Sequence, residues 1–412
     1  MRFFNILIFF LLSIPLTSAA EKQTIQKAWI LETPGGEILS STNPDATMTP
    51  ASILKILTSL YALETLGPDY RITTPVSRDR DNFLVIKASA DPLLTSNPLR
   101  DMVTRLATAT PERNFKGIII DISAFEKKLP VDGISPLSQR SYNAPLTPFA
   151  VNFNSVSFKT EKGHFVSSEN ETPFLPMVLA PVRASRLASG RIALPSDNDF
   201  PMHYAAAMVR YFLEDAGFTF EESKTDFRYE NPEIPDILLL EYSSPFTVTD
   251  IVHQLMAFSN NYVANKLLLA TALKDTDHSG PLSLEKAGIY FSDFIKNKLG
   301  IEGFVVEEGS GLSRKNRITA KEMLKALHAF SPYMSLMRRE NQGWFKTGTL
   351  SDVRTRAGYL RGPNGWYPYV IMTQGENEAY PLYLNILRKE ARTGRSLSSS
   401  GSGMAPDNPA IN

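Results

Sequence analysis

Three short motifs whose residue types suit acyl transfer occur in a fixed order along this chain of 412 residues. Ser52 and Lys55 form an S-x-x-K motif, Ser259 and Asn261 form an S-x-N motif, and Lys346 opens a K-T-G triplet. A chain of average composition should contain roughly one S-x-x-K, roughly one S-x-N and on the order of 0.1 K-T-G triplets by chance. Each motif alone is weak evidence, so the order and the predicted setting of the motifs carry the argument.

Ser52 is the candidate nucleophile because the sequence around it predicts the start of a buried helix. Thr49 and Pro50 provide a hydroxyl N-cap and a proline for the first turn. Free N–H groups and the helix dipole there favour developing negative charge. Lys55 lies one turn later on the same face and could take the serine proton if desolvation keeps the amine neutral. Apolar residues continue the helix at Ile53, Ile56, Leu57, Leu60 and Leu63, up to a stop near Gly67. Alone, the motif would more simply describe a solvated lysine on an ordinary helix.

Ser259 and Asn261 lie at a predicted break between two helices, where side chains can point into a cleft. The Ser259 hydroxyl could relay a proton from Lys55 toward a leaving group, and the Asn261 amide could hold a substrate carbonyl. Alone, this motif would be interpreted as an N-capping pair at a helix junction.

The K-T-G triplet lies on a predicted edge strand at 344–349. Lys346 would place a positive charge near the terminal carboxylate of a substrate and would help to lower the pKa of Lys55. Thr347 would hydrogen-bond that carboxylate. The alternative for this motif is an edge strand protected from pairing by its charge.

Gly348 and Thr349 complete the candidate site on the backbone side. Gly348 lets a substrate approach the strand closely, and the N–H groups of Thr349 and Ser52 would form an oxyanion hole. The motifs call for no metal or other cofactor. The predicted catalytic residues are Ser52, Lys55, Ser259, Asn261 and Lys346, and the predicted substrate-binding residues are Thr347, Gly348 and Thr349.

Composition excludes several other classes of protein. With 43 basic and 43 acidic residues the net charge is zero, which disfavours nucleic acid or a strongly anionic membrane as partner. The absence of cysteine excludes disulfides, thiol catalysis and cysteine-bound metal. The five histidines are scattered and none forms an H-E-x-x-H motif, which disfavours a zinc hydrolase.

The first 20 residues have the pattern of a secretory signal peptide. Arg2 precedes an apolar run at 3–14, and small residues at 17–20 end it. The run is too short to be a convincing membrane span, and no later segment is apolar enough to cross a bilayer. We therefore predict export to the periplasm with no stable span after signal removal, and an uncleaved anchor is the alternative.

The length predicts two or three domains. Ser52 and Ser259 are 207 positions apart, from 259 − 52, yet one substrate must reach both. We therefore predict a discontinuous catalytic domain at 21–75 and 239–392, an inserted accessory domain at 76–238 and a disordered tail at 393–412. Strands are expected at 26–39 with a turn at 35–36, and at 83–86, 117–121, 304–306, 344–349, 357–360 and 369–372; helices are expected at 99–107, 202–215, 324–330 and 383–388, and on both sides of 259–261.

Together, these features resemble one branch of the low-molecular-mass penicillin-binding proteins, the D-alanyl-D-alanine carboxypeptidase/endopeptidase branch. Members of that branch carry a large insertion between the first two motifs. Beyond the three motifs, the resemblance rests on 309–314 (GSGLSR), on KTGTL at 346–350 with AGY at 357–359, on 143–145 with 154–157, and on 204–207 with Gly217. It implies an α/β (α+β) fold, with a β-lactamase/transpeptidase-like catalytic domain whose antiparallel sheet is packed by helices.

The resemblance also implies a function. The chain would be a serine DD-peptidase that cleaves peptidoglycan stem peptides and cross-links through an acyl-enzyme on Ser52, and β-lactam antibiotics would acylate the same residue. A β-lactamase of the same fold is the nearest alternative, but we find no persuasive motif for its deacylation base between Ser52 and Ser259. A catalytically silent wall-binding protein is the second alternative. The sequence does not indicate the oligomeric state.

Departures from the family pattern concern two places. Glu308 stands where an aspartate is usual and Asn265 where an acid is common, and we expect both changes to be tolerated. Near 135–138 the chain lacks a Trp-and-Asp pattern, and Leu137 stands about where relatives carry an acid that contacts the amino group of diaminopimelate. We therefore predict weak discrimination at the third peptide position, unless Asp132 replaces that acid.

Overall fold

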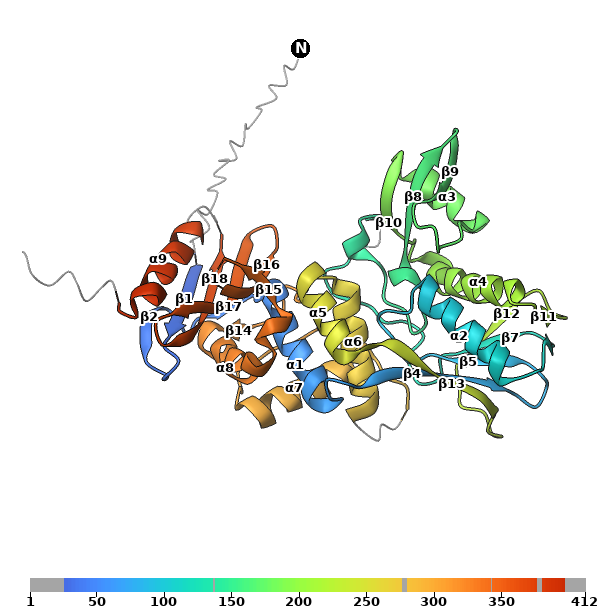
Figure 1. The fold of residues 1–412 in the computed structure, drawn as a ribbon, viewed down its shortest axis with the longest axis horizontal. Coiled ribbons are helices and arrows are strands. Elements are labelled where there is room, and N and C mark those ends of the chain that lie inside the picture. Colours follow the sequence, from blue (N-terminus) through green and yellow to red (C-terminus); the bar gives the residue numbers. More distant parts are fainter. Residues whose placement is uncertain (1–25, 136–137, 276–279, 342, 376–379, 397–412) are drawn as a thin grey trace, which may run out of the picture.

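The computed structural model describes residues 26–135, 138–275, 280–341, 343–375 and 380–396. The predicted signal peptide, Leu137 and most of the predicted C-terminal tail lie outside these ranges. Two lobes lie side by side (Figure 1). One contains a six-stranded sheet and most of the long helices, and the other, which we call the insertion lobe, spans 71–247.

The six-stranded sheet is antiparallel throughout, in the order β15-β16-β17-β18-β1-β2. Its strands are β15 Arg338–Glu340, β16 Gly343–Thr349, β17 Val353–Gly362, β18 Gly365–Gln374, β1 Gln26–Glu32 and β2 Ile38–Thr42. Side chains of β18 alternate between two apolar layers, because successive residues of a strand point to opposite faces. Tyr369 and Ile371 pack with α9 (Tyr380–Thr393), whereas Val370 and Met372 join the main core, which includes α8 (Ala320–Phe330).

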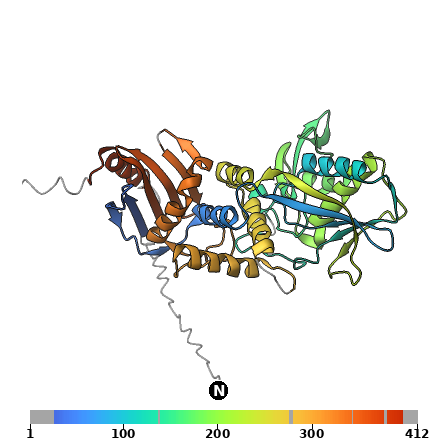
Figure 2. The ribbon, with the colours of Figure 1, turned by 60° about the horizontal axis from the view of Figure 1, so that its bottom comes forward.

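Helix α1 (Lys55–Thr65) is the centre of the main core. Every residue from Lys55 to Leu63 is buried, as expected for a helix that is covered on all sides. It contacts α8 and also α5 (Val248–Phe258), α6 (Asn261–Asp275) and α7 (Leu284–Leu299). A turned view shows α1 and α8 beside the sheet, with α5 and α6 between the sheet and the insertion lobe (Figure 2). The helix that begins with Lys55, directly after the turn that carries Ser52, is therefore held rigidly.

The insertion lobe is built on a mixed five-stranded sheet in the order β12-β7-β5-β4-β13. Its strands are β4 Arg71–Arg78, β5 Leu84–Lys87, β7 Ile118–Asp121, β12 Thr225–Arg228 and β13 Ile237–Thr247, and its two long helices are α2 Ser96–Ala109 and α4 Phe200–Asp215. A three-stranded sheet projects from it, in the order β10 (Ser189–Ala193), β8 (Ser155–Glu161) and β9 (His164–Ser167). The remaining short elements are α3 Leu179–Ala184, the pair β3 Thr47–Met48 with β14 Ile318–Thr319, and the pair β6 Asn114–Phe115 with β11 Thr219–Phe220.

Strands β4 and β13 pair along most of their length and connect the two lobes. The predicted boundaries at 75/76 and 238/239 fall inside these two strands, so a division near 71 and 247 keeps the five-stranded sheet whole. The division into a catalytic domain and an inserted domain stays a proposal. Within the described ranges, no helix has the length and apolar character that a membrane span requires.

Three local predictions were wrong. Residues 304–306 form no strand, and only one bridge joins Val305 to Arg317. Thr49 does not cap a helix, because its Oγ1 accepts from Arg317 Nη1 at 3.1 Å and a 3-10 turn precedes α1. Strand β16 is not an edge over its whole length, because β15 pairs with Gly343, Trp344 and Phe345. From Lys346 onward that side of the strand is free of β15 and faces the start of α1.

Candidate active site

Ser52 lies in a 3-10 turn, Ala51–Leu54, directly before α1. Ala51 has a φ of +48°, which is uncommon for a residue with a side chain and often marks functional sites. Two glycines allow the close packing that holds this turn. A Cβ added to Gly348 would lie 2.6 Å from Ser52 N, and one added to Gly311 would lie 1.9 Å from Ala51 O. Strand β16 and the 309–314 segment can therefore approach the Ser52 backbone only because these positions lack side chains.

Lys55 Nζ has three partners at hydrogen-bonding distance. They are Ser52 Oγ at 2.8 Å, Asn261 Oδ1 at 2.8 Å and Ser310 O at 2.7 Å. The amide oxygen and the backbone carbonyl can only accept hydrogen bonds. A neutral amine therefore gives its two N–H bonds to these acceptors and points its lone pair at the Ser52 hydroxyl, which must then donate. This arrangement is that of a general base beside its nucleophile.

The pKa of Lys55 lies well below its ordinary value. Complete burial is the main cause, the nearby charge of Lys346 adds to it, and Glu308 acts in the opposite direction. The charge of Lys346 thus acts on Lys55 in the predicted direction, and a lowered pKa is what a lysine needs to serve as a neutral base.

Asn261 Oδ1 is used by Lys55, and Asn261 Nδ2 contacts Tyr142 O at 3.4 Å. The predicted contact with a substrate carbonyl would thus be made by Nδ2. Asn261 begins α6 after a break at Ser259, whose φ is +56°.

The Ser259 hydroxyl accepts from Lys346 Nζ at 2.7 Å. Lys346, and not Lys55, is therefore the lysine partner that the structure gives to this hydroxyl. Lys346 Nζ also donates to Thr347 O at 2.8 Å. Burial, together with the charge of Arg338, lowers the pKa of Lys346 to about 7.

Thr347, Gly348 and Thr349 continue β16 past Lys346. Thr347 is half-buried, Gly348 is buried and Thr349 is exposed, so the strand presents its accessible edge beside Ser52. All eight predicted site residues thus belong to α1 and the turn before it, the α5–α6 junction, or β16. Their individual roles stay predictions.

Glu308 belongs to the site, although the sequence indicated only that glutamate in place of the usual aspartate would be tolerated. Its buried carboxylate accepts from Ser310 N at 2.8 Å, Leu312 N at 2.7 Å and Asn316 Nδ2 at 2.9 Å. It therefore orders the segment whose Ser310 O binds Lys55. Asn265 Nδ2 also donates to Glu308, at 3.1 Å, where an acid at position 265 would repel it. The contact between residues 265 and 308 could have been suspected from the sequence, because both positions depart from the family pattern.

Asp132 is engaged elsewhere. It accepts from Ser313 Oγ at 2.5 Å, and Lys315 Nζ lies 3.7 Å from its other oxygen. Replacement of the missing acid by Asp132 would require these contacts to be exchanged, and the third-position preference stays a prediction.

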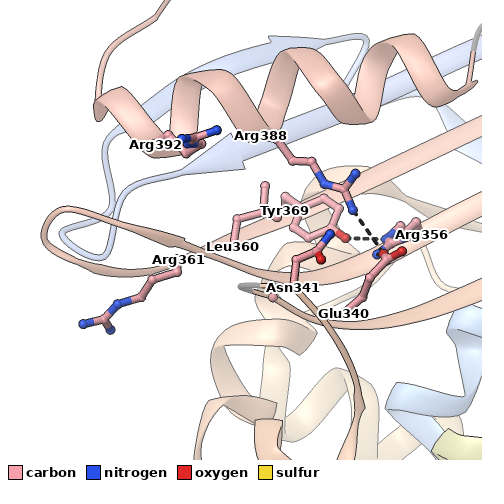
Figure 3. A pocket seen from close by; sticks show the side chains of 9 residues that line it. Glu340, Asn341, Arg356, Leu360, Arg361, Tyr369, Arg388 and Arg392 are labelled. Atoms are coloured by element: carbon pink, nitrogen blue, oxygen red, sulfur yellow. Dashed lines mark hydrogen bonds and ion pairs between the residues drawn. The ribbon is translucent and has the colours of Figure 1, made fainter.

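An arginine-rich cavity of about 340 Å³ lies where α9 covers the sheet and contains none of the site residues. Arg356 donates to Tyr369 Oη at 2.7 Å and to Glu340 at 2.6 Å, and Arg388 also reaches Glu340 (Figure 3). These contacts lower the pKa of Glu340. Among the described residues, no group of three or more histidine, aspartate or glutamate side chains could hold a metal ion.

Comparisons with known proteins identify a matching family. A model of the D-Ala-D-Ala carboxypeptidase 3 (S13) family matches residues 15–178 and 196–335. A D-alanyl-D-alanine carboxypeptidase of Actinomadura sp. (strain R39) is 24% identical over 428 residues, which covers 86% of this chain and 78% of that protein. The penicillin-sensitive carboxypeptidase A of Dictyostelium discoideum is 20% identical over 393 residues, 79% of this chain and 74% of that protein.

Among solved structures, penicillin binding protein 4 of Haemophilus influenzae is similar, with a TM-score of 0.71 and 18% identity over 89% of this chain and 96% of that chain. The same protein in complex with a β-lactam gives a TM-score of 0.65 over 89% of this chain and 97% of that chain, also at 18% identity. The expected fold, a β-lactamase/transpeptidase-like arrangement of antiparallel sheet and helices with an extra domain, is confirmed.

Proposed function

Because this chain belongs to the D-Ala-D-Ala carboxypeptidase 3 (S13) family and is a serine-type D-Ala-D-Ala carboxypeptidase, we propose that it hydrolyses peptidoglycan stem peptides through an acyl-enzyme on Ser52. One observation carries the proposal. Two of the three partners of Lys55 Nζ only accept hydrogen bonds, so the lone pair of a neutral Lys55 amine is left for the proton of the third partner, the Ser52 hydroxyl.

Acylation begins when Lys55 takes the Ser52 proton as Oγ attacks the carbonyl carbon of the penultimate D-Ala. The N–H groups of Ser52 and Thr349 hold the oxyanion. The C–N bond then breaks, and the departing amine takes a proton from Ser259, which recovers one from Lys346. Proton exchange between the two lysines restores neutral Lys55. In the second half-reaction Lys55 takes a proton from water as the water oxygen attacks the ester carbon. The C–Oγ bond then breaks, Lys55 returns the proton to Ser52 Oγ at 2.8 Å, and the shortened peptide is released with a carboxyl end.

The charged form of Lys346, with Thr347, binds the terminal carboxylate of the substrate. Removal of a terminal D-Ala and hydrolysis of a D-Ala–diaminopimelate cross-link share this chemistry and differ in the leaving group. We therefore include both carboxypeptidase and endopeptidase activity in the proposal.

The proposal places this work in the periplasm, after export by a signal peptide at residues 1–20. It is supported by the sequence pattern of that segment and by the family, whose substrates end in D-Ala-D-Ala. β-Lactam antibiotics are expected to be inhibitors, since a protein that binds a β-lactam shares the fold.

Incubation with a fluorescent penicillin tests the function and separates its alternatives. A label that persists for many minutes on the protein is the predicted result. Rapid release of hydrolysed penicillin would identify a β-lactamase, and no label would identify a silent binding protein. Digestion of sacculi followed by chromatography should then show fewer pentapeptide and fewer dimeric muropeptides.

A further inference from the structure

A cavity of about 500 Å³ opens beside Ser259 and is lined by both lobes. Gln254, Phe258 and Ser259 contribute from the α5–α6 region, and Tyr142 and Arg191 contribute from the insertion lobe. Ser259 is the proposed proton donor to the leaving group, and its hydroxyl contacts the carboxylate-binding Lys346. The cavity therefore adjoins the site at Ser259, and neither Ser52 nor Lys55 is among the described residues that line it.

Three aromatic side chains, Tyr142, Phe153 and Phe258, help to line this cavity. Phe258 is 78% exposed and Tyr142 is 50% exposed, although large apolar side chains are usually covered. Phe153 lies in the left-handed region with a φ of +60°, between Asn152 at +55° and Asn154 at +48°. Three such residues in succession are strained and persist only when their surroundings enforce them.

The enforcing contacts come from the two asparagines. Asn152 Oδ1 accepts from Ser96 N at 2.9 Å, and Asn154 Nδ2 donates to Pro145 O at 2.8 Å. The Phe153 ring meets Tyr262 edge to face, at 6.1 Å between centroids. The fold thus holds the Phe153 ring in a fixed place, packed against the main core and present in the lining of the cavity.

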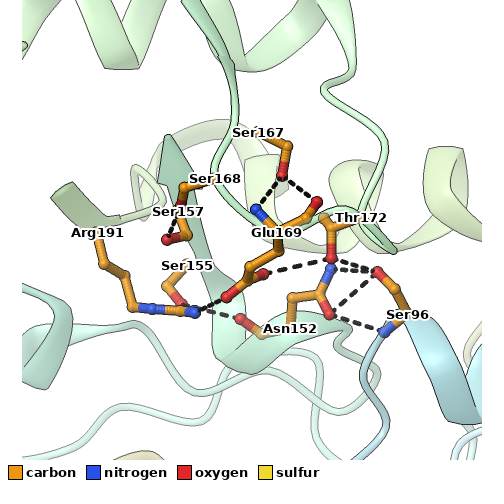
Figure 4. Close-up of polar contacts among 9 residues, drawn as sticks. All are labelled: Ser96, Asn152, Ser155, Ser157, Ser167, Ser168, Glu169, Thr172 and Arg191. Carbon is orange, nitrogen blue, oxygen red and sulfur yellow. Dashed lines mark hydrogen bonds and ion pairs between the residues drawn. The ribbon is translucent and has the colours of Figure 1, made fainter. Parts of the chain in front are cut away.

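Arg191 is the one charged side chain among the described residues that line the cavity. Its Nη1 donates to Ser155 Oγ at 2.9 Å, and its Nη2 pairs with Glu169 (Figure 4). Glu169 does not line the cavity. It pairs with the guanidinium from outside the cavity, and the contacts with Ser155 and Glu169 use two of the five N–H donors of Arg191. A planar guanidinium held in this way suits a carboxylate.

We propose that this cavity binds the second stem peptide of a cross-link, the strand that leaves when the amide is cut, and that Arg191 binds the carboxylate at the carboxyl end of that strand. The inference rests on the proposed function and deepens it. A single departing D-Ala would not extend into the cavity, whereas a leaving strand would place its aliphatic part on Phe153, Phe258 and Tyr142. Arg191 is thus a specificity-determining residue for endopeptidase cleavage.

The test compares three substrates with the full chain and with Arg191→Gln and Arg191→Lys. The substrates are a pentapeptide ending in D-Ala-D-Ala, a cross-linked peptide dimer, and the same dimer with the carboxyl end of its leaving strand amidated. We expect Arg191→Gln to lower kcat/KM for the free-acid dimer about tenfold, as for the loss of one charge-assisted hydrogen bond, and to change pentapeptide hydrolysis less than twofold. Arg191→Lys should recover part of the loss. Arg105→Gln, which removes an exposed ion pair on α2, is the matched control.

The ratio of kcat/KM for the free-acid dimer to that for the amidated dimer is a second measurement. A folding defect would lower both values alike and leave this ratio unchanged. The wild-type protein should prefer the free-acid dimer over the amidated dimer about tenfold, and Arg191→Gln should cleave the two alike. Equal cleavage of both dimers by the wild type, or a wild type that cuts the pentapeptide and no dimer, would overturn the inference. A wild type that cuts neither substrate and takes no penicillin would instead refute the proposed function.

Discussion

At the scale of single residues, the two lysines have different hydrogen-bond partners despite similar burial. Lys55 contacts the nucleophile, and Lys346 contacts Ser259 and its own strand. Both pKa values are lowered by burial, but only the amine beside Ser52 has two obligate acceptors that fix its lone pair on a hydroxyl. The division of roles follows from these partners and not from the charges.

The first prediction separates the two lysines by substitution. Lys55→Arg should reduce acylation by benzylpenicillin by about 10²–10⁴-fold, because a guanidinium cannot act as a general base in a protein. Lys346→Arg keeps the charge and should retain partial activity. Stopped-flow measurement of acylation rates distinguishes them, and equal, mild losses in both variants would contradict the assignment.

The second prediction concerns pH. A lysine is charged below its pKa, so Lys346, with a pKa of about 7, should lose its hold on a carboxylate as the pH rises through 7. In the inactive Ser52→Ala protein, affinity for a peptide ending in D-Ala-D-Ala should fall by up to about tenfold per pH unit as the pH rises above about 7, the pKa of free Lys346, until it reaches the higher pKa that Lys346 has beside a bound carboxylate. Calorimetric titration between pH 6 and pH 9 measures this. The peptide amide and the Ser52→Ala/Lys346→Arg protein are the controls, and neither should show the decline. A flat affinity for the free acid would refute the role of Lys346.

At the scale of elements, the segment from Glu308 to Asn316 positions Lys55, the proposed base. Ser310 O is one of the two acceptors that orient Lys55, and Glu308 holds the backbone around it. Because Glu308 also raises the pKa of Lys55, it has an electrostatic effect that a purely structural residue would lack.

The third prediction tests this segment. Glu308→Gln places an NH₂ group among donors and should cost about 1.5–3 kcal/mol of unfolding free energy. The substitution should also lower the pKa of Lys55, because the Glu308 charge that stabilises its protonated form is lost. The part of the pH–acylation profile that reflects titration of Lys55 should therefore shift to lower pH. Glu308→Asp keeps the charge and should retain the limb of the wild type. Identical profiles in all three proteins would show that Glu308 acts only on folding.

Most elements around the site could be predicted from local patterns. The strand at 344–349, the helix through Ile56 and Leu60, and the break at Ser259 all appeared where the spacing of apolar residues placed them. Local patterns failed where a distant partner decided the structure. The Thr49 hydroxyl accepts a hydrogen bond from Arg317 and therefore does not cap the helix. Strand β15 pairs with the first three residues of β16, which the sequence had predicted to be an edge strand.

At the scale of the whole molecule, the two lobes meet around the α5–α6 region, and one buried lysine is part of that contact. Lys266 on α6 donates to Pro148 O at 2.8 Å and to Thr147 O at 3.3 Å in the insertion lobe. Burial lowers its pKa to about 7, although the charge of Asp91 opposes the shift. This contact could not be predicted from the sequence, because its acceptors are backbone carbonyl groups far away along the chain, and local sequence around the lysine does not identify them.

The fourth prediction follows from linkage. Lys266 has a folded pKa of about 7 and a higher unfolded pKa, so the unfolded state binds more protons between these values and stability rises with pH there. Lys266→Met should reduce the slope of unfolding free energy between pH 7.5 and pH 9 by up to about 1.4 kcal/mol per pH unit. Urea unfolding at several pH values measures this slope. Lys274→Met, on the same helix, is the control and should leave the slope unchanged; an unchanged slope in Lys266→Met would show that Lys266 keeps an ordinary pKa.

The pairing of the motifs across the chain is the central claim, since it requires Ser52, Asn261 and Lys346 to act as one site. Mass spectrometry of the protein after benzylpenicillin tests it most directly. The account predicts one penicilloyl adduct, on the peptide that contains Ser52, and no adduct on Ser52→Ala. An adduct on Ser259, or continued labelling of Ser52→Ala, would contradict it.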